Sequence, residues 1–120
     1  MDRLILFRQT LRKIVNDYRS YLPHHEDIDV IAICDDENGQ YALFEVGWRY
    51  PQRVYSPLFH ARIKGKMIWL EQDWTKRGIV QDLLNEGIRP NEIEQGNIAP
   101  MLRATSDLAE MRTFSALKNP

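Results

Sequence analysis

The sequence has a single cysteine, a net charge close to zero and no long apolar run, and each of these features excludes a class of protein. Its 120 residues include one cysteine, Cys34, which excludes an internal disulfide and suits a reducing compartment. The chain has 16 Lys and Arg against 17 Asp and Glu. A protein that coats nucleic acid is clearly basic, so this balance argues against that class. No apolar run is long enough to cross a bilayer, and the first residues lack the layout of a signal peptide. The sequence therefore predicts a soluble cytoplasmic protein of one domain, with no membrane contact.

The motifs of common enzymes are also missing. The chain has no glycine-rich phosphate loop, CxxC pair or GxSxG elbow. Residues 24–27 (HHED) are the most metal-like cluster, but no second ligand group is spaced to complete a site, so neither a metal nor a cofactor is expected. Cys34 with His60 as its base is one nucleophilic possibility, although a thiol in a β-branched strand is more often a small core group with a raised pKa.

A small hydrolase is the remaining enzymatic hypothesis. It would use His60, Glu71 and Asp73, which must converge in one partly desolvated pocket to exchange protons with a substrate. Asp73 has a plainer role before a helix, where its charge meets the positive end of the helix dipole. We therefore expect a protein without catalytic activity.

Hydrophobic periodicity predicts two helices. Apolar side chains recur at spacings of three and four over residues 4–22, which indicates an amphipathic helix closed by Pro23. A second helix is expected after Asp73 and Thr75, which offer capping oxygens, and before Gly87, which suits a helix end. As the N-cap, Thr75 would contribute about 1 kcal/mol to stability.

Four strands are expected between these helices. Residues 28–34 are rich in β-branched side chains and apolar on both faces, which predicts a strand that is central or buried on both sides. Pro57 lacks a donor for the sheet and should lie at an edge or a bulge. The other expected strands, joined by tight turns, cover residues 41–50, 53–63 and 67–72. The predicted fold is α+β with two layers, an antiparallel four-stranded meander packed with the two helices.

The domain itself is expected to occupy residues 1–100. Beyond Pro100 the apolar density falls, so residues 101–120 are predicted to be a C-terminal extension, partly helical and loose from about residue 115. The apolar residues that could form a marginal helix there are Leu108, Met111 and Phe114.

Aromatic side chains are more numerous on the predicted sheet than one covered face requires. Trp, Tyr and Arg anchor protein interfaces, so the surplus predicts a protein–protein surface, in a homodimer or in a complex with another protein. The residues assigned to this surface are Trp48, Tyr50, Tyr55 and Trp69.

Direct DNA contact is the alternative interpretation. The first helix has a basic outer face, and a stretch around residue 50 mixes basic and aromatic side chains as base-stacking surfaces do. Six carboxylates between residues 26 and 37 would repel phosphates if they lie near this surface. The residues assigned to DNA contact are Arg8, Arg12, Arg49 and Arg53.

An ordered set of short motifs resembles one protein family. The motifs are Val46-Gly47-Trp48, Arg53-Val54-Tyr55, residues 68–75 (IWLEQDWT) and residues 78–88 (GIVQDLLNEGI). In this order, within residues 1–100, they resemble the XisI-like proteins, controlling factors for excision of the fdxN element in heterocyst-forming cyanobacteria. Lys76 and residues 94–98 depart from the family pattern, which bears on contacts of the C-terminal region and not on the fold.

The resemblance implies an accessory role in programmed DNA rearrangement. It implies a companion, a XisH-like protein that resembles the restriction-endonuclease fold, which this chain would hold in check or activate. No catalytic residues are carried over from the family.

Overall fold

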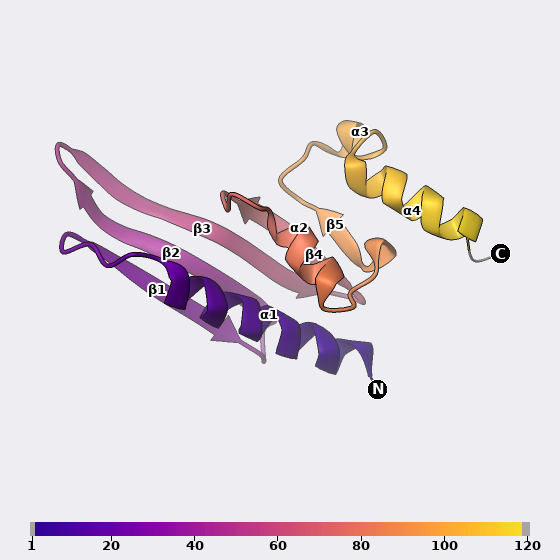
Figure 1. Cartoon of the computed structure of the whole chain (residues 1–120), viewed down its shortest axis with the longest axis horizontal. Helices are drawn as coiled ribbons and strands as arrows, with labels where there is room; N and C mark the ends of the chain where they lie inside the picture. The colour runs from indigo at the N-terminus through magenta and orange to yellow at the C-terminus, as the bar shows by residue number, and fades with distance from the viewer. Residues whose placement is uncertain (1, 119–120) are drawn as a thin grey trace.

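The structure is a computed structural model that describes residues 2–118, with side chains for residues 2–113. The molecule is elongated, with extents of 54 × 32 × 23 Å, and its helices α1 and α2 lie in front of the sheet in Figure 1. The elements in chain order are α1 (Arg3–Tyr21), β1 (Ile28–Asp35), β2 (Gln40–Arg49), β3 (Gln52–Lys64), β4 (Met67–Asp73), α2 (Ile79–Asn85), the 3-10 turn η1 (Pro90–Glu92), β5 (Ile93–Gln95), α3 (Pro100–Arg103) and α4 (Asp107–Lys118).

Helix α1 agrees with the predicted helix to within one residue at each end. Its first turn is capped by Asp2, whose carboxylate accepts a hydrogen bond of 3.0 Å from the backbone N–H of Leu4. The apolar stripe is buried against the sheet and forms one core with residues of β2 to β5. The buried side chains of α1 are Phe7, Thr10, Leu11, Ile14 and Val15.

The sheet has five strands in the order β1-β2-β3-β4-β5, so the prediction of a purely antiparallel, four-stranded meander is wrong because it omits β5. The first four strands are antiparallel neighbours, as expected, but β5 is parallel to β4, with Ile93 opposite Ile68. A three-residue strand carries no periodicity that sequence reasoning could detect. It forms because α2 and η1 return the chain to the edge of β4, where Ile93 is fully buried.

The expectation that residues 28–34 form a central strand is also wrong. Strand β1 lies at the edge of the sheet, and Ile31 and Ile33 are 44% and 39% exposed. Helix α1 covers only the face that carries Val30, Ala32 and Cys34, which pack against the core. The second apolar face of β1 therefore lies on the side of the sheet away from α1.

Pro57 lies where the missing donor costs little, as predicted. It pairs with Phe44 beside a register shift between Leu43 and Phe44. The pairing of β3 with β4 begins only at Phe59, so β3 has no second neighbour at Pro57.

Helix α2 begins three residues later than an N-cap at Thr75 would place it, and Thr75 is not its N-cap. The cap position is Gly78, and the carboxylate that serves the helix comes from Asp73. Its oxygens accept hydrogen bonds from the backbone N–H of Ile79 (2.7 Å), from the backbone N–H of Thr75 (3.0 Å) and from the Thr75 hydroxyl (2.6 Å). Asp73 thus organises the whole turn, and Thr75 supports it by accepting from Gly78 N–H at 3.2 Å.

This geometry predicts that Asp73→Ala destabilises the protein more than Thr75→Ala does. Asp73→Ala leaves several donors of the turn without a partner and should cost about 2 kcal/mol, against about 1 kcal/mol for Thr75→Ala. Urea unfolding followed by circular dichroism measures both values. Equal losses would mean that Asp73 has no special part in starting α2.

The C-terminal segment packs on the domain. Leu108 of α4 is 3% exposed and belongs to the core. Arg112 donates to the backbone carbonyl of Pro90 at 2.9 Å and pairs with Glu94 at 2.7 Å, which ties α4 to η1 and β5. Helix α4 continues to Lys118 and so includes residues 115–118, which were expected to be loose, and the side chain of Phe114 lies outside the described residues.

Candidate protein-interaction face

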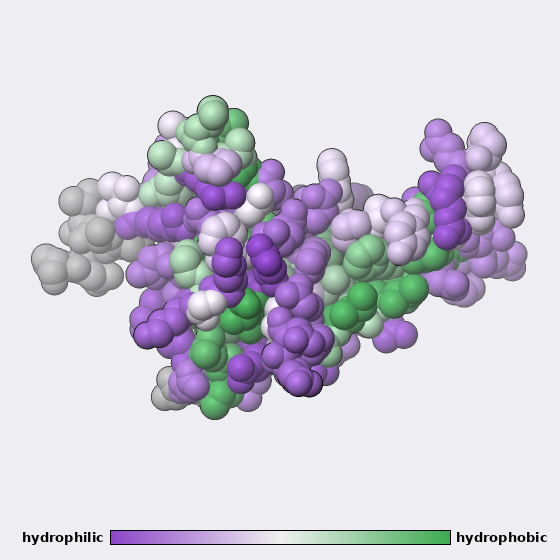
Figure 2. Space-filling view, turned by 180° about the vertical axis from the view of Figure 1, so that it is seen from behind, coloured by the Kyte–Doolittle hydropathy of each residue, from purple (hydrophilic) through white to green (hydrophobic). Residues whose placement is uncertain are grey.

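The face of the sheet that points away from α1 and α2 carries a continuous apolar surface, here called the open face. The strand register aligns its side chains: Ile31 lies opposite Phe44, and Val46 lies opposite Tyr55. Figure 2 looks onto this side of the molecule and shows a hydrophobic patch between polar margins. The open face consists of Ile31, Ile33, Phe44, Val46, Trp48 and Tyr55.

Aromatic rings line the end of the open face that lies on the β2–β3 hairpin. The rings of Phe44 and Tyr55 are 6.3 Å apart between centroids, and those of Trp48 and Tyr50 are stacked at 6.0 Å. The guanidinium of Arg53 lies 5.6 Å from the Trp48 ring and 5.7 Å from the Tyr55 ring. These contacts hold the rings in place before any partner binds, which lowers the entropic cost of association.

Three of the four residues assigned to a protein surface are thus brought together. Trp48, Tyr50 and Tyr55 are 42%, 75% and 69% exposed. Trp69 lies apart from them on β4, with Lys64 at 5.1 Å and Arg103 at 5.4 Å from its ring centre. The C-terminal segment therefore contacts Trp69, and the ring is only half-exposed.

Sequence reasoning missed the aliphatic part of the open face. Both faces of residues 28–34 are apolar, a pattern that predicts a buried strand and therefore buried positions for Ile31 and Ile33. The alternation of the strand was visible, but nothing in it distinguishes a face covered by a helix from one left open to a partner.

The four arginines assigned to DNA contact do not form one patch. Arg8 and Arg12 belong to α1, and Arg12 pairs at 2.8 Å with Asp36, in the turn that precedes β2. Arg49 lies at the far end of β2 and pairs with Glu45 at 3.0 Å. A ten-residue strand spans about 30 Å, so the two pairs are separated by the length of β2.

Asp36 links α1 to the sheet. Its carboxylate accepts a hydrogen bond of 2.5 Å from the Tyr41 hydroxyl as well as the contact from Arg12. The hydrogen bond from Tyr41 and the charge of Arg12 lower the pKa of this carboxyl, and burial raises the pKa of the Tyr41 hydroxyl. Arg12 and Asp36 therefore neutralise each other locally.

The three residues of the hydrolase hypothesis do not converge in one site. The Nε2 atom of His60 lies 2.8 Å from Oε1 of Gln40, and Glu71, although near enough for its charge to act on His60, faces Arg62 at 3.6 Å. Asp73 belongs to the turn before α2. Burial raises the pKa of the Cys34 thiol, as expected for a packed cysteine. Among the described residues, no three His, Cys, Asp or Glu side chains are grouped to hold a metal ion, and residues 24–27 are exposed.

The environment of His60 leads us to expect a loss of stability in mild acid. The amide nitrogen of Gln40 donates to the carbonyl of Asn38, so Oε1 of Gln40 accepts from a neutral His60 that carries its proton on Nε2. Burial is the main cause that lowers the pKa of His60 from its ordinary value of 6.5. Because the folded-state pKa is the lower one, this contribution is complete above pH about 6.5 and is lost as the pH falls toward the folded-state value.

We therefore expect the free energy of unfolding to decline between about pH 7 and pH 5, and His60→Gln to reduce that decline. Urea titrations at several pH values measure it. The carboxylates with lowered pKa titrate in a more acidic window, so they do not mask the effect. An identical slope in the variant would contradict the assignment.

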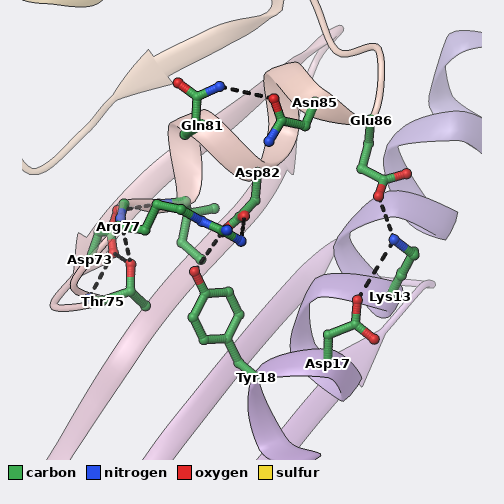
Figure 3. Close-up of polar contacts among 12 residues, drawn as sticks. Lys13, Asp17, Tyr18, Asp73, Thr75, Arg77, Gln81, Asp82, Asn85 and Glu86 are labelled. Atoms are coloured by element: carbon green, nitrogen blue, oxygen red, sulfur yellow. Dashed lines mark hydrogen bonds and ion pairs between the residues drawn. The ribbon is translucent and has the colours of Figure 1, made fainter. Parts of the chain in front are cut away.

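A polar cluster joins α1 to α2, as Figure 3 shows. The hydroxyl of Tyr18 donates to buried Asp82 at 2.5 Å, and Arg77 pairs with the other oxygen of the same carboxylate. Lys13 pairs with Glu86 at the end of α2. Since both oxygens of Asp82 are engaged within the protein, this cluster serves to dock the two helices.

An apolar groove of about 540 Å³ lies beside this cluster, between the end of α1 and the turn before α2. Tyr21 and Trp74 line it and are exposed, with Leu22 and Leu58 also in its wall. Tyr18, which also lines it, is already bonded to Asp82.

The fold and the open face together define a small α+β protein that presents a preformed aromatic surface. Among the described residues, no helix combines the length and apolar character needed to cross a membrane. The sequence profile of the family described as XisI protein matches residues 1–110, and the chain belongs to this family.

Solved structures agree with this assignment. A XisI-like protein from Anabaena variabilis is 31% identical, with a TM-score of 0.81 over 87% of this chain and 95% of the other. The fdxN element excision controlling factor XisI from Anabaena variabilis is 28% identical, with a TM-score of 0.78 over 88% of this chain and 96% of the other. No curated protein matches the chain.

Proposed function

We propose that this chain is a non-enzymatic controlling factor in the excision of a DNA element, and that it acts in the cytoplasm through contact with a XisH-like protein of nuclease fold. The family membership and the description of a structural neighbour as an excision controlling factor support the first part. The observation that carries the second part is the open face, whose Trp48 and Tyr55 remain exposed beside Arg53.

Energetics favour a protein partner for this surface. Removing apolar side chains from water yields roughly 25 cal/mol per Å², and aromatic anchors with a neighbouring arginine are the side chains that dominate measured interfaces. Because Arg53 already stacks on both rings, association would order few additional groups. The open face therefore has the composition of an interface centre.

The test is co-expression with the XisH-like protein, followed by size-exclusion chromatography with light scattering. We expect one complex at micromolar concentration, and a loss of affinity of about 30-fold for Trp48→Ala, as for a central interface tryptophan. Trp74→Ala is the matched control, because Trp74 is 69% exposed but lies outside the open face. Separate elution of the two proteins, or equal effects of both substitutions, would contradict the proposal.

The same preparation tests the other expectations. Light scattering of the chain alone reports whether it forms the expected homodimer. A DNA mobility shift that weakens steeply between 50 and 200 mM salt, and that disappears in Arg49→Ala/Arg53→Ala, would favour the DNA-binding alternative.

A further inference from the structure

Strand β1 leaves one side of its backbone without a partner. The sheet order begins with β1, so within the described residues only β2 pairs with it along its length. At its start the chain folds back, and the N–H of Ile28 donates to the carbonyl of His25 at 3.3 Å. Beyond this point the outer edge is free.

One hydrogen bond determines which backbone N–H and C=O groups of β1 point away from β2. The N–H of Trp48 donates to the carbonyl of Asp27 at 2.9 Å, which makes these two residues a hydrogen-bonded pair. Bonded and non-bonded pairs alternate along an antiparallel ladder, so the backbone groups of Ile31 point to β2. The backbone groups of Val30, Ala32 and Cys34 then point outward, as does the N–H of Ile28 described above.

The central part of this edge lacks the devices by which proteins normally protect a strand. Residues 30–34 (VIAIC) contain no charge, no proline and no register shift. An unprotected apolar edge is a template for another strand. It is also continuous with the open face through Ile31 and Ile33, so an added strand would enlarge the apolar surface of the sheet.

Charge decides what kind of strand fits. Acidic residues precede and follow the apolar centre, and four of them are exposed and take part in no ion pair among the described residues. These four are Glu26, Asp27, Asp29 and Glu37. In an antiparallel pairing with a second copy, the acidic start of one β1 would face the acidic end of the other, which is destabilising.

We infer that the outer edge of β1 binds an extended segment of a partner protein, with apolar side chains in its centre and Lys or Arg at both ends. The added strand would receive backbone hydrogen bonds from Val30, Ala32 and Cys34, as in other cases of strand addition. The inference rests on the proposed function, in which the chain acts through a protein partner, and it specifies where and how that partner is held.

The experiment titrates the full-length, 15N-labelled chain with a synthetic peptide of three valines alternating with two threonines, with two lysines at each end. We expect saturable amide shifts below about 1 mM, centred on Val30, Ala32 and Cys34. The same peptide with glutamates in place of the lysines should bind at least about tenfold more weakly.

Two pairs of variants locate the binding. Ala32→Pro removes an outward N–H without removing a bond to β2, so it should abolish binding, whereas Ala32→Val should preserve it. Asp29→Lys should weaken the lysine peptide about fivefold, and Glu110→Lys, an equal charge change on α4, should leave its affinity unchanged. Circular dichroism confirms that each variant is folded.

The outcomes that overturn the inference are distinct. They are the absence of shifts at 1 mM, equal affinity for both peptides, or shifts centred on β5. A dimer of the chain alone that Ala32→Pro dissociates would assign the edge to a second copy instead. If the peptide fails while the XisH-like protein still co-elutes, the edge assignment falls and the proposed function stands; if the peptide binds and co-elution fails, the reverse holds.

Discussion

Replacing Gly47 with alanine is expected to destabilise the protein by about 3 kcal/mol, and to lower its melting temperature by about 10 °C. A Cβ atom at this position would lie 1.9 Å from the carbonyl oxygen of Asp27 and 2.8 Å from the Cα of Ile28. Neither backbone can withdraw freely, because the N–H of Trp48 holds the same carbonyl and Ile28 begins β1 opposite Gly47. The substitution must therefore separate the ends of β1 and β2.

Gly65→Ala is the control for this prediction. Gly65 also has a positive φ, of +62°, but nothing lies within 4 Å of its potential Cβ. Its substitution should cost only the backbone strain of about 1 kcal/mol. Thermal unfolding monitored by circular dichroism compares the two. If Gly47→Ala loses no more stability than Gly65→Ala, the close approach at Asp27 does not constrain the fold.

Phe59→Ala is expected to cost about 4 kcal/mol, the largest loss among the substitutions considered. Phe59 is fully buried in the centre of the sheet, and its ring meets that of Tyr18 edge to face at 5.8 Å. Removing it leaves a cavity under α1 and removes the support for the Tyr18 ring, whose hydroxyl holds Asp82. The connection between α1 and α2 should therefore weaken together with the core.

Phe44→Ala is the control for Phe59→Ala. Phe44 belongs to the open face and is only half-buried, so its loss should cost about 1 kcal/mol in the isolated chain. Urea unfolding gives both values. Similar losses would show that the open face is part of the folding core and does not await a partner.

The local elements of this fold could be predicted because their signals are local. The stripe of α1, the tight turns and the alternation of β2 depend on residues near one another in the sequence. Strand β5 and the true start of α2 could not be predicted, since the first depends on a return of the chain to β4 and the second on Asp73, six residues before Ile79. Pro57 at a register shift was predictable because proline excludes the alternatives.

The residues of the candidate site also fall into a predictable and an unpredictable group. The aromatic residues Trp48, Tyr50 and Tyr55 could be proposed from composition, since their number exceeds what one covered face needs. The isolation of Trp69 under Arg103 could not, because Arg103 belongs to a segment whose position no periodicity indicates. Nor could the free edge of β1, whose apolar sequence resembles that of a strand enclosed on both sides.

The parallel pairing of β4 with β5 also has a consequence for the order of folding. The three antiparallel pairings join strands that short connections link, whereas β5 reaches β4 only across α2 and η1. Pairings that close longer loops carry the larger entropic cost and form later. The open face is therefore expected to assemble while the C-terminal third of the chain is still being synthesised, so that a partner could engage the nascent protein before β5 closes the sheet.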